Sequence, residues 1–145
     1  MEVSLEIEKP GAEDLQEIKQ LLQQNKLPVE DIADLSHFFI AKKGKKIAGV
    51  IGLEVYNQYG LLRSMVTDAN YRKYSIASSL VDKLFQYAVE LGLKEMYLLT
   101  ETAEQYFQKK GFHTIERDNA PKAIKQTKEF SHLCPSSAVV MKKIV

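Results

Sequence analysis

The chain has 145 residues, of which 45% are hydrophobic and 27% charged, the balance of an ordinary globular protein. Its formal net charge of +1 gives no strongly basic surface, so we expect neither a nucleic-acid-binding protein nor one that binds anionic membranes. The single cysteine, Cys134, excludes an internal disulfide and a cysteine-based metal cluster, and no stretch has the pattern of a signal peptide or a membrane span, so we expect a cytoplasmic location.

The spacing of apolar residues predicts the elements of the first half of the chain. Leu5 and Ile7 alternate with polar residues, as in a strand with one buried face. In chain order we expect a strand over 3–7, a helix over 15–25, a short helix over 28–35, strands over 38–41 and 47–56 joined by the lysine-rich hairpin turn 42–46, a turn at 57–60 and a strand over 61–67.

The second half begins with a helix whose apolar stripe is Ile76, Leu80, Leu84 and Ala88, and which Gly92 ends. We then expect a buried strand over 96–99, a helix capped by Thr100 or Thr102 and ended by Gly111, a strand over 112–116, a helix over 120–130 and a strand over 138–145. This order predicts an α/β (α+β) fold in one domain, 1–145, with a mixed, mostly antiparallel central sheet of about seven strands flanked by helices.

Two cations, Arg72 and Lys73, come just before the helix that carries this stripe. A helix N-terminus offers unpaired N–H groups and about half a positive charge, so a strand, a loop and a helix in this order can hold a phosphate group. The alternative is that both cations are solvated and that Ser75 is only an N-cap. The sequence has no Walker A motif and no G-x-G-x-x-G motif, so we expect neither a nucleoside triphosphate nor a nicotinamide cofactor.

Two motifs, taken with the order of elements, resemble the GNAT N-acetyltransferases, which use acetyl-CoA. The loop Arg72-Lys73-Tyr74-Ser75-Ile76-Ala77 is similar to that family's pyrophosphate loop, Gln/Arg-x-x-Gly-x-Gly/Ala. The family's second motif is a helix that ends in an aromatic pair, followed after three residues by Gly-Phe, and the stretch from Tyr106-Phe107 to Gly111-Phe112 is similar to it. The stretches GLEVY (52–56), LLRS (61–64) and 120–138 resemble more narrowly the acetyltransferases of arsenic-resistance operons, which are similar to the amino-acid acetyltransferase branch.

The resemblance implies where the co-substrate acetyl-CoA binds. It enters between the fourth and fifth strands. Backbone groups of Met65, Val66 and Thr67 hold the pantetheine arm, and Thr100 and Phe107 complete the binding set. The pyrophosphate lies on the loop formed by Arg72, Lys73, Tyr74, Ser75, Ile76 and Ala77.

The chain departs from the family pattern at four of these positions. Lys73 stands where another glycine is common, and Thr100 stands where an asparagine is usual. Ser75 replaces a glycine; a serine at negative φ is tolerable there, so we expect weakened rather than abolished cofactor binding. Phe107 stands where the family has the tyrosine that protonates the departing thiolate. Its neighbour Tyr106 is either a substitute acid or a core aromatic with its hydroxyl at the rim, in which case water protonates the thiolate.

The acceptor site is expected on the hairpin that carries Glu54 and Arg63, which should be cross-strand neighbours. Either they form a structural ion pair, or Glu54 removes the proton from the amine while Arg63 holds a substrate carboxylate. Glu129 and Ser136 lie on the connection before the last strand, where the resembled family has substrate loops. The predicted acceptor is a small amine that carries a carboxylate.

The remaining polar residues indicate less. The three histidines, His37, His113 and His132, have no ligand spacing, so we expect no metal. Cys134 is either a small buried residue or a nucleophile, and the second role would need a nearby base to lower its pKa. The last strand suits an edge that pairs with a second copy in a homodimer. The sequence therefore predicts an N-acetyltransferase in which the amine attacks the thioester directly. The alternative is a GNAT-fold module that binds an acyl-CoA or a partner without transfer.

Overall fold

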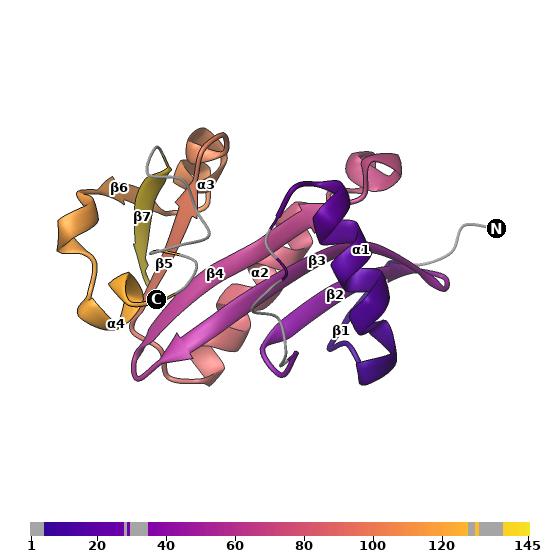
Figure 1. Ribbon diagram of the computed structural model, residues 1–145, viewed down its shortest axis with the longest axis horizontal. Coiled ribbons are helices and arrows are strands. Elements are labelled where there is room, and N and C mark those ends of the chain that lie inside the picture. The colour runs from indigo at the N-terminus through magenta and orange to yellow at the C-terminus, as the bar shows by residue number, and fades with distance from the viewer. Residues whose placement is uncertain (1–4, 28, 30–34, 128–129, 131–137) are drawn as a thin grey trace. The chain divides into compact units, whose positions relative to one another are not determined.

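The computed structural model describes residues 5–27, 29, 35–127, 130 and 138–145 (Figure 1). The elements are β1 (Leu5–Glu8), η1 (Ala12–Asp14), α1 (Leu15–Gln24), β2 (Phe38–Lys43), β3 (Lys46–Tyr56), β4 (Tyr59–Thr67), η2 (Ala69–Tyr74), α2 (Ile76–Glu90), β5 (Glu95–Thr100), α3 (Glu104–Lys109), β6 (His113–Ile115), η3 (Arg117–Asn119), α4 (Lys122–Lys125) and β7 (Val139–Ile144).

The strands form the predicted seven-stranded mixed sheet, in the order β1-β2-β3-β4-β5-β7-β6. The pairs β1–β2, β2–β3, β5–β7 and β6–β7 are antiparallel, whereas β4 and β5 are parallel and pair from Tyr59↔Glu95 to Leu61↔Tyr97. The predicted fold class is therefore confirmed. The expectation that the last strand is a sheet edge is wrong, because β7 lies between β5 and β6. No helix in the described part of the chain is long and apolar enough to cross a membrane.

The two hairpin turns are tighter than predicted. β2 continues to Lys43 and β3 begins at Lys46, which leaves Gly44, at φ 66°, in a two-residue turn. The second turn has Asn57 at φ 57° in the same position. A positive φ at the first central residue gives a turn whose twist matches that of the flanking strands, and glycine and asparagine adopt it most readily.

Two helix predictions fail at their ends, and a third lies outside the described residues. Neither Thr100 nor Thr102 caps α3, because the helix begins at Glu104 after Ala103; instead the Thr100 hydroxyl accepts a hydrogen bond from the Ala103 N–H at 3.0 Å. The helix expected over 120–130 ends at Lys125, because the Thr127 hydroxyl donates to the Ile124 carbonyl at 2.8 Å and so replaces a helical partner. The short helix expected over 28–35 falls largely on 28 and 30–34, which are not described.

Contacts divide the chain into two compact units. Unit 1 contains residues 1–53 and 64–87. Its α1 lies on one side of the strands and α2 on the other (Figure 1). One core cluster consists of Ile18, Leu21, Leu22, Phe38, Ile40, Ile47, Val50 and Val66. The predicted stripe of α2, Ile76, Leu80, Leu84 and Ala88, is fully buried, which confirms the helical periodicity.

Gly49 on β3 sets how closely α2 approaches this part of the sheet. A methyl group at Gly49 would lie 2.8 Å from Cγ2 of Ile76 and 3.1 Å from the Val66 carbonyl oxygen. Because only a residue without a side chain allows this approach, Gly49 brings the first turn of α2 against β3 and the end of β4.

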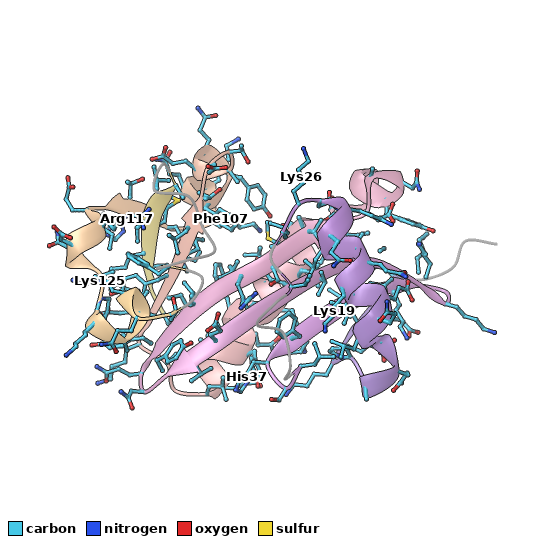
Figure 2. The ribbon with its side chains drawn as sticks, in the orientation of Figure 1. Lys19, Lys26, His37, Phe107, Arg117 and Lys125 are labelled. Carbon is cyan, nitrogen blue, oxygen red and sulfur yellow. The ribbon has the colours of Figure 1, made fainter. Side chains whose placement is uncertain are left out.

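Unit 2 contains residues 54–63 and 88–145. Its core cluster consists of Leu61, Tyr97, Ala120, Ile124, Phe130 and Val140, with Tyr56, Tyr59, Leu99 and Ile115 packed against it. Arg117, labelled in Figure 2, donates to the Ala138 carbonyl at 2.9 Å and lies 4.9 Å from the centre of the Phe130 ring. These contacts attach the start of β7 to this core.

Candidate functional site

The turn before α2 is built on β4 and β3. The Asp68 N–H donates to the Ala48 carbonyl at 2.8 Å, and the Asp68 carboxylate accepts from the Asn70 N–H at 2.9 Å. The chain then passes through η2, whose last turn contains Arg72, Lys73 and Tyr74, and reaches Ser75. The turn is therefore held at a defined place beside the end of β4.

Ser75 has φ 57° and ψ 31°, the left-handed conformation. A serine at negative φ would have been tolerable here, but the position has a positive φ, which is the case in which a glycine matters. The chain must reverse its handedness between η2 and α2, and this conformation costs a non-glycine residue about 1 kcal/mol or more. A glycine would adopt the same conformation without that cost.

The Ser75 hydroxyl is not a side-chain N-cap. The residue is exposed, and its side chain makes no hydrogen bond within the described part of the chain, while its carbonyl accepts the Ser79 N–H at 3.2 Å. The hydroxyl therefore does not occupy the first N–H groups of α2, at Ile76 and Ala77. Those groups are the ones that bind an anion at a helix N-terminus.

The end of β4 supplies the other candidates in unit 1. Val66 is 8% exposed, and Met65 and Thr67 are half-buried. Ser64, just before them, is buried at φ 57°, and a left-handed residue inside a strand locally interrupts its pleat. Val66 and Ile76 both lie against Gly49, so the structure brings two predicted cofactor positions together.

The acceptor candidates of unit 2 form a cluster of Glu54, Tyr56 and Arg63, which we call the Glu54 cluster. Nη1 of Arg63 donates to Oε2 of Glu54 at 2.9 Å, and the Tyr56 hydroxyl donates to Oε1. The side chain of Arg63 is 3% exposed and that of Glu54 is 22% exposed. The prediction that Glu54 and Arg63 are neighbours is confirmed.

The sequence interpretation missed Tyr56, although a signal was available. Successive residues of a strand alternate between its two faces, so Tyr56 lies on the same face as Glu54. The cluster combines one carboxylate, one guanidinium and one phenol. A guanidinium presents several N–H donors in a fixed plane, the geometry with which proteins bind carboxylates.

A second cluster in unit 2, Glu95, Tyr97 and Lys142, has a similar composition, with a lysine in place of the arginine, and we call it the Glu95 cluster. The Tyr97 hydroxyl donates to Oε1 of Glu95, and Nζ of Lys142 lies 3.6 Å from the same oxygen. Burial, and then the hydrogen bond to the Glu95 carboxylate and its charge, raise the pKa of Tyr97 well above its usual value.

The aromatic candidates lie on α3. Phe107 is 4% exposed, and its ring centre lies 5.3 Å from that of Tyr106 and 5.6 Å from that of Phe112 (Figure 2). The oxygen of the Tyr106 hydroxyl is buried, so the expectation of a hydroxyl at the rim is wrong. Gly111, at φ 99°, ends the helix as predicted, and the Phe112 N–H donates to the Phe107 carbonyl at 3.0 Å.

The other polar candidates have structural partners. Nδ1 of His37 lies 2.6 Å from the Tyr87 hydroxyl (Figure 2). Lys42, from the lysine-rich hairpin, lies 3.4 Å from the Asp14 carboxylate and 3.9 Å from that of Glu8. Partial burial acts to lower the pKa of Lys42, but these carboxylates raise it overall. Across the described ranges, no group of three His, Cys, Asp or Glu residues is placed to hold a metal. Glu129, His132, Cys134 and Ser136 lie outside those ranges.

The sequence profile of the Acetyltransferase (GNAT) family matches residues 5–113, about three quarters of the chain. The chain belongs to the GNAT acetyltransferase family. It is therefore assigned to the acyltransferases, and the order of its strands and helices is that of the GNAT fold. No curated protein has significant sequence similarity to this GNAT chain.

Solved structures share this fold at low sequence identity. N-acetylglutamate synthase from Neisseria gonorrhoeae, complexed with coenzyme A and L-arginine, matches 99% of this chain at a TM-score of 0.83 and 15% identity. The chain spans only 34% of that protein's length. Rv2747 from Mycobacterium tuberculosis, in complex with CoA and NLQ, matches at 0.80 and 21% identity, over 97% of this chain and 99% of its own. The PaiA N-acetyltransferase from Thermoplasma acidophilum, in complex with coenzyme A, matches at a TM-score of 0.72 and 15% identity. The match covers 98% of this chain and 99% of that protein.

Proposed function

We propose that the chain is an acetyl-CoA-dependent N-acetyltransferase that acts on a small amine bearing a carboxylate. The observation that carries the proposal is the turn before α2, in which a left-handed Ser75 leaves the first N–H groups of the helix to an anion. Three structurally similar proteins contain coenzyme A, whose pyrophosphate is such an anion, and this supports the assignment.

Unit 1 supplies the residues proposed to hold the co-substrate. The N–H groups of Ile76 and Ala77, with Arg72, Lys73, Tyr74 and Ser75, bind the pyrophosphate. The backbone of Met65, Val66 and Thr67 binds the pantetheine arm. Thr100 and Phe107, which belong to unit 2, remain predicted acetyl-CoA-binding residues.

The Glu54 cluster is proposed to act on the acceptor. A protonated amine cannot attack, so a base must remove one proton first. Both oxygens of Glu54 already accept hydrogen bonds, which favours proton removal through an intervening water. Arg63 is the proposed anchor for the acceptor's carboxylate. Glu129 and Ser136 remain proposed substrate contacts.

The transfer itself is a direct displacement. The amine nitrogen attacks the thioester carbon, so that a C–N bond forms and the C–S bond breaks without an acyl-enzyme. The thiolate leaves and takes a proton. Phe107 has no proton to give, and Tyr106 is a weak candidate because its oxygen is buried. A thiol has an ordinary pKa near about 8.5, so water is a sufficient donor.

A thermal-shift titration tests co-substrate binding before any acceptor is known. A ligand at about a hundred times its Kd stabilises a protein by about 2.7 kcal/mol, which is several degrees for a domain of this size. We expect acetyl-CoA and CoA to raise the melting temperature and ATP to leave it unchanged. No shift with millimolar acetyl-CoA would contradict the proposal.

The alternative function is a GNAT-fold module that binds an acyl-CoA or a partner without transfer. The observation that favours it is Phe107, which has no hydroxyl and packs between Tyr106 and Phe112. Binding of acetyl-CoA without turnover on any amine would select this alternative. We also propose that residues 1–145 are one acetyltransferase domain, since β3 and β4 each contribute to both units. A cytoplasmic location, a homodimer and the absence of nucleic-acid and membrane partners stay predictions.

A further inference from the structure

Tyr56 fixes one of the two oxygens of Glu54. Its hydroxyl donates to Oε1, while Nη1 of Arg63 donates to Oε2 at 2.9 Å. In the described part of the chain, no other charged or titratable side chain is in hydrogen-bond or ion-pair contact with this carboxylate. With a separate donor on each oxygen, the carboxylate can neither rotate nor change its partners without breaking a hydrogen bond.

The ring of Tyr56 is itself held in place. It is half-buried and packs against the core cluster of unit 2, which contains Leu61, Tyr97 and Phe130. A side chain whose ring is fixed by a core holds its hydroxyl with little freedom. Tyr56 is therefore placed to orient the Glu54 carboxylate.

We propose that Tyr56 is a positioning residue for acetyl transfer, acting through Glu54 by holding one carboxylate oxygen and so fixing the orientation in which the carboxylate receives the amine's proton through water. This inference rests on the proposed function, because it has meaning only if Glu54 handles the acceptor.

The Glu95 cluster provides a matched control. Tyr97 also follows its glutamate by two residues and also donates to Oε1 of that glutamate, with Lys142 as the cation. No step of the proposed reaction uses Glu95. The substitutions Tyr56→Phe and Tyr97→Phe remove the same hydroxyl and keep the same ring, so a general effect of losing a tyrosine–glutamate hydrogen bond appears in both variants.

The experiment compares kcat and KM of the wild type, Tyr56→Phe and Tyr97→Phe with acetyl-CoA and the fastest acceptor from a panel of α-amino acids. We expect Tyr56→Phe to lower kcat about tenfold, as for loss of one hydrogen bond to a charged group. The KM of both variants for acetyl-CoA and the kcat of Tyr97→Phe should stay as in the wild type.

A double substitution separates positioning from a structural role. If Tyr56 acts only through Glu54, then Tyr56→Phe has no further effect on kcat in a Glu54→Gln background. An active wild type whose kcat is unchanged by Tyr56→Phe, or additive losses in the double variant, would overturn the inference about Tyr56 alone. A wild type that binds acetyl-CoA but acetylates no amine would overturn the proposed function, and the role of Tyr56 with it.

Discussion

Two clusters of similar composition lie in unit 2 and differ in their cation and its burial. In each, a glutamate accepts a hydrogen bond from a tyrosine two residues later and pairs with a cation from another strand. In the Glu54 cluster the cation is Arg63, 3% exposed and 2.9 Å from the carboxylate; in the Glu95 cluster it is Lys142, 26% exposed and 3.6 Å away.

The difference in burial separates two kinds of ion pair. An exposed lysine pair contributes about 0–1 kcal/mol to stability, so the Glu95 cluster needs no explanation beyond the sheet surface. Burying a guanidinium costs several kcal/mol that its partner only partly offsets, and apolar residues often do as well for stability. A buried pair of this kind therefore suits a role in binding or catalysis.

The largest expected contrast is in turnover. Glu54→Gln keeps the shape of the side chain but removes the base, so kcat should fall by about a hundredfold or more, and the acidic limb of the pH–rate profile should disappear. Glu95→Gln should change kcat less than twofold. Both are measured as initial rates of CoA release. A Glu54→Gln enzyme with an unaltered pH–rate profile would remove Glu54 from the role of base.

The next contrast is in stability and acceptor recognition. Arg63→Met leaves the Glu54 carboxylate without its cation and should lower the free energy of unfolding by about 3 kcal/mol, whereas Lys142→Met should lower it by less than about 1 kcal/mol. Urea denaturation measures both. Equal losses would mean that the two clusters are alike.

The same arginine variant tests the proposed anchor. We expect Arg63→Met to raise the KM for carboxylate-bearing amines and to leave the KM for matched amines without a carboxylate unchanged. If the KM for every amine stays the same, Arg63 is a structural residue only.

A third contrast depends on alkaline pH. The folded state raises the pKa of Tyr97, so the unfolded chain loses this proton first, above its ordinary pKa of about 10. The contribution of the neutral Tyr97 to the free energy of unfolding is complete below about pH 10. Above that pH it falls by about 1.4 kcal/mol for each further pH unit. Between pH 9 and 11 the wild type should lose more stability than Tyr97→Phe by about 1 kcal/mol in urea denaturation. Parallel curves would show that Tyr97 is not held in its neutral form.

The smallest expected effect lies in unit 1 and leaves both clusters untouched. Ser75→Gly removes the cost of the left-handed serine, which its own freedom in the unfolded chain partly offsets, so we expect a gain of about 0.5–1 kcal/mol. We also expect CoA to bind more tightly in calorimetry, with the pH–rate profile unchanged. Weaker binding of CoA would show that the Ser75 hydroxyl itself contributes to the site.

Strong, regular patterns in the sequence predicted most of the fold. The stripe from Ile76 to Ala88 and the alternation in the strands follow from burial, which one chain shows directly in its apolar spacing. The Glu54–Arg63 contact followed from a short hairpin, whose length limits the register.

The failures came where side chains replace backbone partners or where the backbone conformation is unusual. Thr127 ends α4 through its hydroxyl, and Thr100 bonds to Ala103 instead of capping α3, choices that spacing alone does not show. Ser75 takes a left-handed conformation that its residue type does not favour, because the turn from η2 into α2 requires it. Tyr56 was predictable from strand alternation, but only after Glu54 had been recognised as part of a site.

Product analysis with matched acceptors tests whether the chain acetylates amines that carry a carboxylate. The wild-type protein is incubated with acetyl-CoA and either an α-amino acid or the corresponding amine without the carboxylate, and the N-acetylated product is quantified by mass spectrometry. The account predicts an N-acetylated amino acid and much slower acetylation of the matched amine. Acetyl-CoA binding with no acetylated product from either compound across the panel would contradict it.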